Sequence, residues 1–217
     1  MIVSRRNLLA GAGGVAALSL ADAMIAPASA AQIEAIGLQL YTVRDIFAKD
    51  PVGTLEQVAR IGYREVEFGG GGYDAMDHAL LRGTMDRLGL KAPSLHIGYD
   101  ALLGQFDRSV TMAKALGADT VVLPYMTDEH RTEQGWRAAL PNFNRFAAEL
   151  KKAGLGFAYH NHDFEFTNRP GGTSLYDRFL GETDAALVKV ELDLYWAAHA
   201  GEDPASLIDR LSQRLHA

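Results

Sequence analysis

The sequence has 217 residues, 48% of them hydrophobic and 22% charged, which suits one folded domain with a sizeable core. It contains no cysteine, which excludes disulfides, thiolate metal ligands and a cysteine nucleophile, so a metal would have to bind to His, Asp or Glu. The formal net charge of -6 at pH 7 disfavours a nucleic-acid partner, because phosphate binding requires a basic surface.

The first thirty residues have the pattern of an export signal. Arg5 and Arg6 precede a stretch rich in Gly, Ala and Leu, which ends in small residues at Ala30. The apolar part is shorter than the roughly 20 residues that span a bilayer, so no stable membrane anchor is expected. We predict a twin-arginine signal peptide over residues 1–30, recognised by the twin-arginine export machinery, and a periplasmic domain over residues 31–217.

From residue 33 onward, short β-rich runs alternate with longer segments of helical period, as in a parallel α/β sheet. The predicted strands are Ile36–Tyr41, Glu65–Gly69, Pro93–Ile97, Thr120–Tyr125, Gly156–His162 and Val188–Tyr195. The predicted helices are Val52–Ile61, Met76–Leu88, Ala101–Leu116, Glu133–Ala153, Ser174–Leu180 and Pro204–Arg214. Several predicted helices end at a glycine just before a strand, and glycine is the residue typical of helix C-caps.

Six βα units fit either an open doubly wound sheet or three quarters of a (β/α)8 TIM barrel. A dinucleotide-binding sheet would carry a G-x-G-x-x-G turn after its first strand, but residues Leu40–Asp45 contain no glycine. The glycine run Gly69–Gly72 follows the second strand and lacks that fingerprint. Glycine placement therefore favours the barrel.

Polar residues occur in strands that should be apolar if buried in a parallel sheet. Those expected at the C-terminal mouth of the barrel are Gln39, Glu67, His96, His160, His162, Glu191 and Asp193. Each alone has a plain explanation, such as a solvated strand end or a hydrogen-bonded core histidine. Burying several ionisable groups together is costly unless they pair or bind a cation, so the set favours one divalent metal ion. Imidazoles and carboxylates without sulfur suit Mn²⁺, Zn²⁺, Co²⁺ or Mg²⁺.

At these positions the chain resembles the sugar phosphate isomerase/epimerase family, which shares the xylose-isomerase-like TIM barrel with endonuclease IV. The matching segments are Ile36–Arg44, Gly62–Glu67, Tyr159–Phe166, Glu191–Trp196 and Gly201–Pro204. The resemblance implies a (β/α)8 barrel with a single divalent metal held by side chains of strands five to eight.

Within that resemblance, Asp193 matches the strand-six metal ligand. The strand-five ligand is a Glu in many relatives, and here the candidates are His160, then His162, then Glu165, with Glu191 as a further candidate on strand six. In members of this family, strand seven would begin near the position at which this sequence stops. We therefore expect a TIM-barrel domain of about six βα units that lacks strands seven and eight and is inactive by itself. His216 is given no ligand role, because we expect it at a helix end or the start of a strand.

For the complete protein, the expected chemistry is isomerisation or epimerisation of a keto sugar or related polyol through an enediolate. Glu67 and Glu165 are the candidate residues that move the proton, with His96 as a polarising donor. One alternative is a lyase or dehydratase that acts on a 3-keto-sugar by the same proton abstraction. An alternative of another class is a non-catalytic periplasmic sugar-binding protein. The sequence is compatible with an oligomer.

Overall fold

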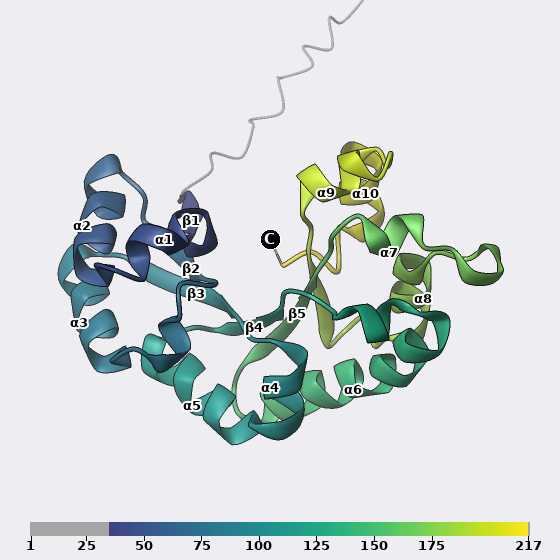
Figure 1. Cartoon of the computed structure of the whole chain (residues 1–217), viewed down its shortest axis with the longest axis horizontal. Coiled ribbons are helices and arrows are strands. Elements are labelled where there is room, and N and C mark those ends of the chain that lie inside the picture. Colours follow the sequence, from purple (N-terminus) through teal and green to yellow (C-terminus); the bar gives the residue numbers. More distant parts are fainter. Residues whose placement is uncertain (1–34, 217) are drawn as a thin grey trace, which may run out of the picture. The chain divides into compact units, whose positions relative to one another are not determined.

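The structure is a computed structural model that describes residues 35–216, so the predicted signal over residues 1–30 lies outside the described residues. Six parallel strands form one sheet, in which the order in space is the order in the chain (Figure 1). The strands are β1 (Gly37–Gln39), β2 (Glu65–Phe68), β3 (Lys91–His96), β4 (Thr120–Leu123), β5 (Gly156–His160) and β6 (Val188–Glu191). This is the sheet of a partial (β/α)8 barrel, as the sequence predicted.

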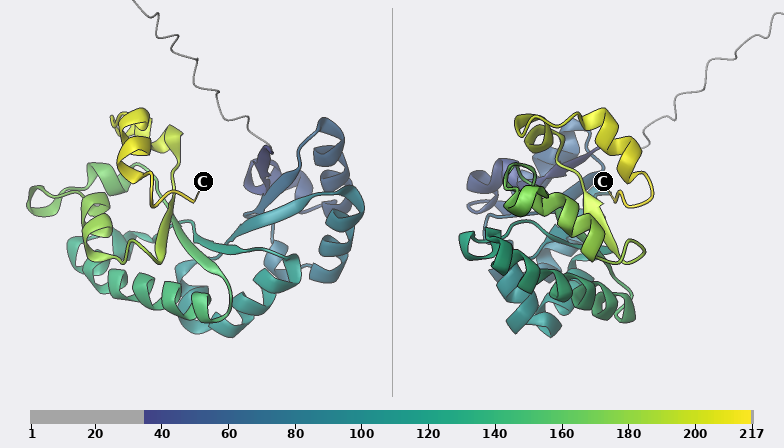
Figure 2. Two further views of the ribbon diagram at one scale, coloured as in Figure 1. Left: turned by 180° about the vertical axis from the view of Figure 1, so that it is seen from behind. Right: turned by 90° about the vertical axis from the view of Figure 1, so that its right-hand side faces the viewer.

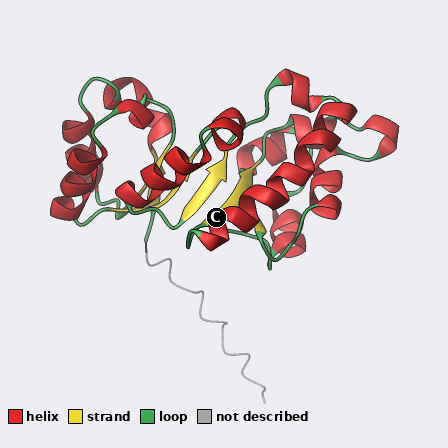
Figure 3. Ribbon diagram, turned by 90° about the horizontal axis from the view of Figure 1, so that it is seen from below, coloured by secondary structure: helices red, strands yellow, loops and turns green. Residues whose placement is uncertain are grey.

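Helices connect successive strands and cover one face of the sheet (Figures 1 and 2), and Figure 3 shows them flanking the strands. The α-helices are α1 (Arg44–Phe47), α2 (Pro51–Ile61), α3 (His78–Leu88), α4 (Tyr99–Gly104), α5 (Phe106–Leu116), α6 (Glu133–Lys152), α7 (Phe164–Thr167), α8 (Leu175–Glu182), α9 (Leu194–His199) and α10 (Pro204–Leu211). Short 3-10 helices are η1 (Leu40–Val43), η2 (Tyr73–Ala75), η3 (Asp128–Arg131) and η4 (Pro170–Gly172). Within residues 35–216, no helix is long and apolar enough to cross a membrane.

The alternation of side chains along a strand gives the sheet a helix-facing side and an inner side. On β2, Val66 and Phe68 belong to the hydrophobic core, and Glu67 between them lies on the other face. On β6, Val190 belongs to the core and Glu191 follows it on the other face. The inner side of the sheet therefore carries ionisable residues near the C-terminal strand ends.

One part of the core lies between β5 and the helices α6 and α8. Phe143 and Trp136 on α6 are fully buried, and their rings lie 5.3 and 5.8 Å from that of Tyr159 on β5. Phe179 on α8 completes the group, with its ring 5.1 Å from Tyr159. Offset and edge-to-face aromatic contacts of this kind favour one fixed packing of helix on sheet. They anchor the strand that carries His160.

The fifth and sixth strands are shorter than the sequence predicted. They end at His160 and Glu191, and the residues that follow form turns and short helices. Asp193 is the N-cap of α9, because its side chain accepts a hydrogen bond from the Trp196 N–H. The apolar residues that suggested a longer strand belong instead to the first turn of a helix.

Helix boundaries differ from the prediction at one interior position. The helix predicted over Ala101–Leu116 is two helices, α4 and α5, which meet at Gln105, where the backbone is not helical (φ -136°, ψ 40°). The short helices α1, α7 and α9 were not predicted, since 4 to 6 residues are too few to show a helical period.

A further stretch of backbone pairs with β6. Leu215 forms a parallel bridge with Val190, and the His216 N–H donates to the Val190 carbonyl at 2.7 Å. The buried Arg214 side chain supports this pairing by donating to the carbonyl of Val188. His216 thus directly follows an isolated β-bridge to β6.

Candidate metal centre

The strand register brings polar residues of the inner face together in two groups. Gln39 on β1 is opposite Glu67 on β2, which is opposite Ser94 on β3. Gln39 Nε2 donates to Glu67 Oε1 at 2.7 Å, and Ser94 Oγ donates to Glu67 Oε2 at 2.5 Å. On the other side, His160 of β5 is opposite Glu191 of β6, and their Nδ1 and Oε1 atoms lie 2.7 Å apart.

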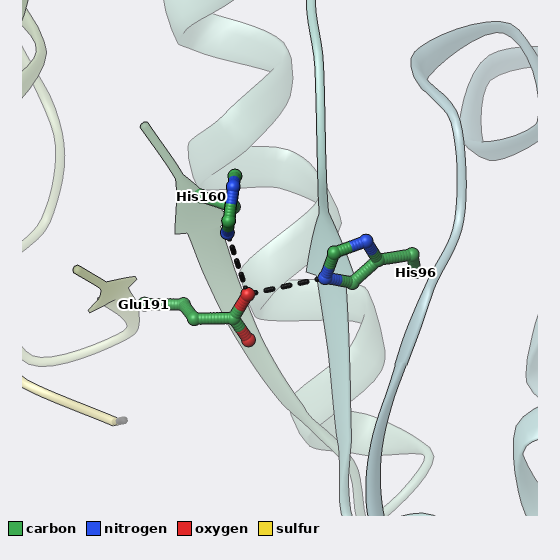
Figure 4. A group of neighbouring side chains, drawn as sticks. All are labelled: His96, His160 and Glu191. Atoms are coloured by element: carbon green, nitrogen blue, oxygen red, sulfur yellow. Dashed lines mark hydrogen bonds and ion pairs between the residues drawn. The ribbon is translucent and has the colours of Figure 1, made fainter. Parts of the chain in front are cut away.

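His96, at the end of β3, joins the two groups. Its Nε2 lies 3.0 Å from Glu67 Oε1 and 3.1 Å from Glu191 Oε1. β3 and β6 are not neighbours in the sheet, so the contact with Glu191 spans the inner side of the partial barrel (Figure 4). The side chains of His96 and Glu191 are each only 10% exposed, which places these charges largely out of water.

Burial and ion pairing have opposite effects on the pKa values of His96 and Glu191. Burial would lower the pKa of His96, but hydrogen bonds to the Glu191 and Glu67 carboxylates outweigh burial and raise this pKa to about 9. Burial would raise the pKa of Glu191, but hydrogen bonds from His160 and His96 hold it well below its ordinary value. In the metal-free protein His96 is therefore an imidazolium at neutral pH, paired with the ionised Glu191.

The same cluster has the composition of a metal site. One ligand atom each from His96, His160 and Glu191 can be chosen so that all lie within 4.8 Å of one another. Glu191 Oε2 is buried and has no hydrogen-bond partner among residues 35–216, which is costly unless a cation is nearby. Two imidazoles and a carboxylate fit a divalent transition metal such as Zn²⁺, Mn²⁺ or Co²⁺. These residues fit the group that the sequence predicted.

Asp193 lies at the border of this cluster. Its Oδ1 is occupied by the helix cap, and its Oδ2 is 3.6 Å from His160 Nε2. His162 lies nearby, and its ring centroid is 5.1 Å from that of His160. Burial, with a contribution from the charge of His160, lowers the pKa of His162 to about 4, so His162 is neutral at neutral pH. Both remain candidate ligands.

The side chain of Glu165 points away from the cluster that the other predicted site residues form. Its side chain is wholly buried, with Oε1 2.5 Å from the Tyr159 hydroxyl and Oε2 accepting from the His162 N–H at 2.8 Å. Burial raises the pKa of Glu165 to about 7, although these hydrogen bonds oppose the shift. Glu165 supports the backbone of the β5 terminus, and its predicted part in proton transfer stays a prediction.

A cavity of about 690 Å³ opens beside the cluster. It is lined by the polar residues Gln39, His96, His160, His162 and Asp193 and by the aromatic residues Tyr41, Tyr125 and Trp196. Such a mixture of apolar faces and a few convergent polar groups is usual in small-molecule sites.

Sequence reasoning missed two residues of this region. Ser94 binds Glu67, and its signal was a polar residue two positions before His96 on the same strand. Asn161 is fully buried between the two histidines of strand five, and a wholly buried amide next to a candidate ligand needs partners.

The fold and the cluster define a class: a parallel α/β barrel sheet with a histidine and carboxylate site at the C-terminal strand ends, where TIM-barrel active sites lie. The family model described as xylose isomerase-like TIM barrel matches residues 55–217. The chain belongs to this family, which confirms the resemblance seen in the sequence.

Solved structures agree with this assignment. A sugar phosphate isomerase/epimerase from Parabacteroides distasonis ATCC 8503 has a TM-score of 0.71 and 25% identity, over 86% of this chain and 75% of that chain. A second sugar phosphate isomerase/epimerase from the same organism has a TM-score of 0.72 and 23% identity, over 83% and 76%. A xylose isomerase-like TIM barrel protein from Mycobacterium smegmatis in complex with magnesium has a TM-score of 0.60 and 14% identity, over 82% and 71%. The last two show the fold alone. No curated protein matches the chain.

Proposed function

We propose that this chain carries the metal site of a sugar isomerase or epimerase that acts on a keto sugar or a related polyol. The observation that carries the proposal is the convergence of His96, His160 and Glu191, with Glu191 Oε2 buried and without a partner among the described residues. A buried oxygen of this kind next to two imidazoles is accounted for economically by a divalent cation. The family and the names of the first two solved relatives support a sugar as substrate.

When bound, a divalent ion supplies Lewis-acid polarisation of a substrate carbonyl or hydroxyl. Of the candidate bases, Glu67 is the better placed, because its carboxylate belongs to the cluster and is held by Gln39 and Ser94. The carboxylate of Glu165 is instead turned towards Tyr159. His96 Nε2 contacts both Glu67 Oε1 and Glu191 Oε1, so the same atom that would bind the metal also holds the two carboxylates close together.

The cavity walls suit a sugar. His162 is neutral at neutral pH and lines the cavity, so it can hydrogen-bond to a hydroxyl without repelling a neighbouring cation. The rings of Tyr125 and Trp196 lie 5.2 and 5.3 Å from that of His162, and their faces can pack on the C–H face of a sugar ring. We also propose that residues 1–30 direct export by the twin-arginine pathway to the periplasm.

The test is metal content by elemental mass spectrometry, combined with product analysis on a panel of keto sugars, for the complete protein, as wild type and as the variant Glu191→Gln. The matched control is Glu202→Gln, which removes a carboxylate that pairs with Arg169 at the surface. About one metal per chain and turnover in the wild type and control, both lost in Glu191→Gln, would support the proposal. An unsaturated product would identify a lyase or dehydratase instead. Unchanged sugar binding without any metal would identify a binding protein.

A further inference from the structure

Asn161 forms a link between β5 and β6 beyond the point where the two strands stop pairing. The last paired residues are His160 and Glu191. Asn161 Oδ1 accepts from the Asp193 N–H at 3.0 Å, and Asn161 Nδ2 donates to the Asp193 carbonyl at 3.2 Å. The amide thus binds both backbone polar groups of one residue, and it is completely buried.

This link fixes Asp193 at three points. Asn161 holds the backbone N–H and the backbone carbonyl, and the Trp196 N–H donates to Asp193 Oδ1 at 2.9 Å. Of the two carboxylate oxygens, Oδ2 faces His160 Nε2 at 3.6 Å. His160 directly precedes Asn161 in the chain. By binding the backbone of Asp193, the Asn161 amide therefore sets the position of Asp193 relative to His160.

We propose that Asn161 is a positioning residue that sets the separation of His160 and Asp193 and thereby the affinity of the site for a divalent cation. This inference rests on the metal site of the proposed function. An amide suits the role because it offers N–H donors and a carbonyl acceptor on the same planar group. A carboxylate lacks the donor, and an apolar side chain of similar size lacks both, so Asp193 would lose its fixed distance from His160.

The chain contains a matched control for this contact. Asn144 on α6 makes the same kind of double hydrogen bond: its Oδ1 accepts from the Asp184 N–H at 2.7 Å, and its Nδ2 donates to the Glu182 carbonyl at 3.2 Å. Asn144 links α6 to the segment that precedes β6. This contact lies at the N-terminal end of β6, whereas the cluster lies at its C-terminal end. Its loss should affect folding without moving a candidate ligand.

The experiment is a titration of the complete protein, freed of metal, with Co²⁺, followed by calorimetry and by visible absorption, for the wild type, Asn161→Leu, Asn161→Ala, Asn144→Leu and Asn144→Ala. Melting temperatures of the metal-free proteins report folding separately. We expect both Asn161 variants to bind Co²⁺ about 10- to 100-fold more weakly, with a changed absorption band, because residues that orient metal ligands commonly have effects of this size. The Asn144 variants should keep the wild-type affinity and spectrum.

Two outcomes overturn the inference in distinguishable ways. If the wild type binds Co²⁺ and a folded Asn161 variant binds it with the same affinity and spectrum, Asn161 has no positioning role, while the metal site stands. If the wild type itself binds no Co²⁺, the proposed metal site fails, and the inference fails with it. The alanine variants provide a smaller side chain in case leucine does not fit the buried position.

Discussion

His96 and Glu191 lie 3.1 Å apart, although two strands separate β3 from β6 in the sheet. The contact exists because the sheet curves, so that strand ends which are not neighbours face one another across its inner side. It joins two hydrogen-bonded groups, Gln39–Glu67–Ser94 and His160–Glu191, into one buried cluster. The following expectations depend on that cluster and on the core that supports it.

Glu191→Gln should lower the pKa of His96. The carboxylate of Glu191 is one of two that oppose the effect of burial, so its neutralisation leaves Glu67 to act alone against burial. The pKa of His96, about 9 in the wild type, is measurable by NMR titration of the metal-free protein. The control Glu202→Gln should leave it unchanged, and a His96 pKa that is the same in Glu191→Gln would contradict the geometry described.

Metal binding near neutral pH should release a proton. His96 is protonated below about pH 9 in the metal-free cluster, and a histidine must be neutral to act as a ligand. Affinity for Zn²⁺ or Co²⁺ should therefore rise about tenfold per pH unit between pH 7 and 9 for one released proton. Calorimetry in buffers of different ionisation enthalpy measures that number directly, and a value of zero at pH 7 would show that no protonated His96 gives up its proton to the metal.

The metal-free protein should lose stability as the pH rises. The folded-state pKa of His96, about 9, lies above the ordinary value of 6.5, so its pairing energy is fully present below pH 6.5 and is lost as the pH passes through about 9. The melting temperature should fall from pH 6.5 to 9.5, and should fall less in His96→Gln. Equal slopes for the two proteins would show that the pairing with Glu67 and Glu191 does not stabilise the fold.

Glu165→Gln separates a structural from a catalytic role for this residue. Burial raises the folded-state pKa of Glu165 to about 7, above the ordinary 4.5, so its favourable contribution is lost as the pH rises through 7. Relative to the wild type, the variant should gain stability between pH 5 and 8, by about 1–3 kcal/mol at the upper end. In the complete protein, unchanged turnover of the variant would confine Glu165 to supporting His162, whereas loss of turnover with normal folding would support a role as the base.

Phe143→Ala should be among the most destabilising substitutions in the chain. The side chain is fully buried between Trp136, Tyr159 and Phe179, and its removal leaves a cavity that the surrounding rings cannot fill. The expected loss is about 3–5 kcal/mol of unfolding free energy, measured by urea denaturation. Phe106→Ala, at a half-buried position packed on Phe146, is the control and should cost less.

The sequence predicted most of the fold because its periodicities are local. Alternation of Val66, Glu67 and Phe68 is enough to place one residue on the inner face, since it follows from the geometry of a single strand. The end of β6 was misjudged because Asp193 continues the period of the strand, and only its side-chain hydrogen bond to the Trp196 N–H shows that it caps α9. The curvature of the sheet, which brings His96 to Glu191, cannot be predicted from the sequence of β3 or of β6 alone.

The sequence by itself therefore determined the parallel α/β class, the order of the units and the residues that face inward at the strand ends. Only the tertiary structure decided which of these residues meet. It placed His96 with the candidate ligands, turned the Glu165 carboxylate into the core and bound Asn161 to Asp193. The physical reason is that strand and helix periods reflect interactions among residues close in the chain, whereas contacts across the barrel depend on the summed twist of the strands between them.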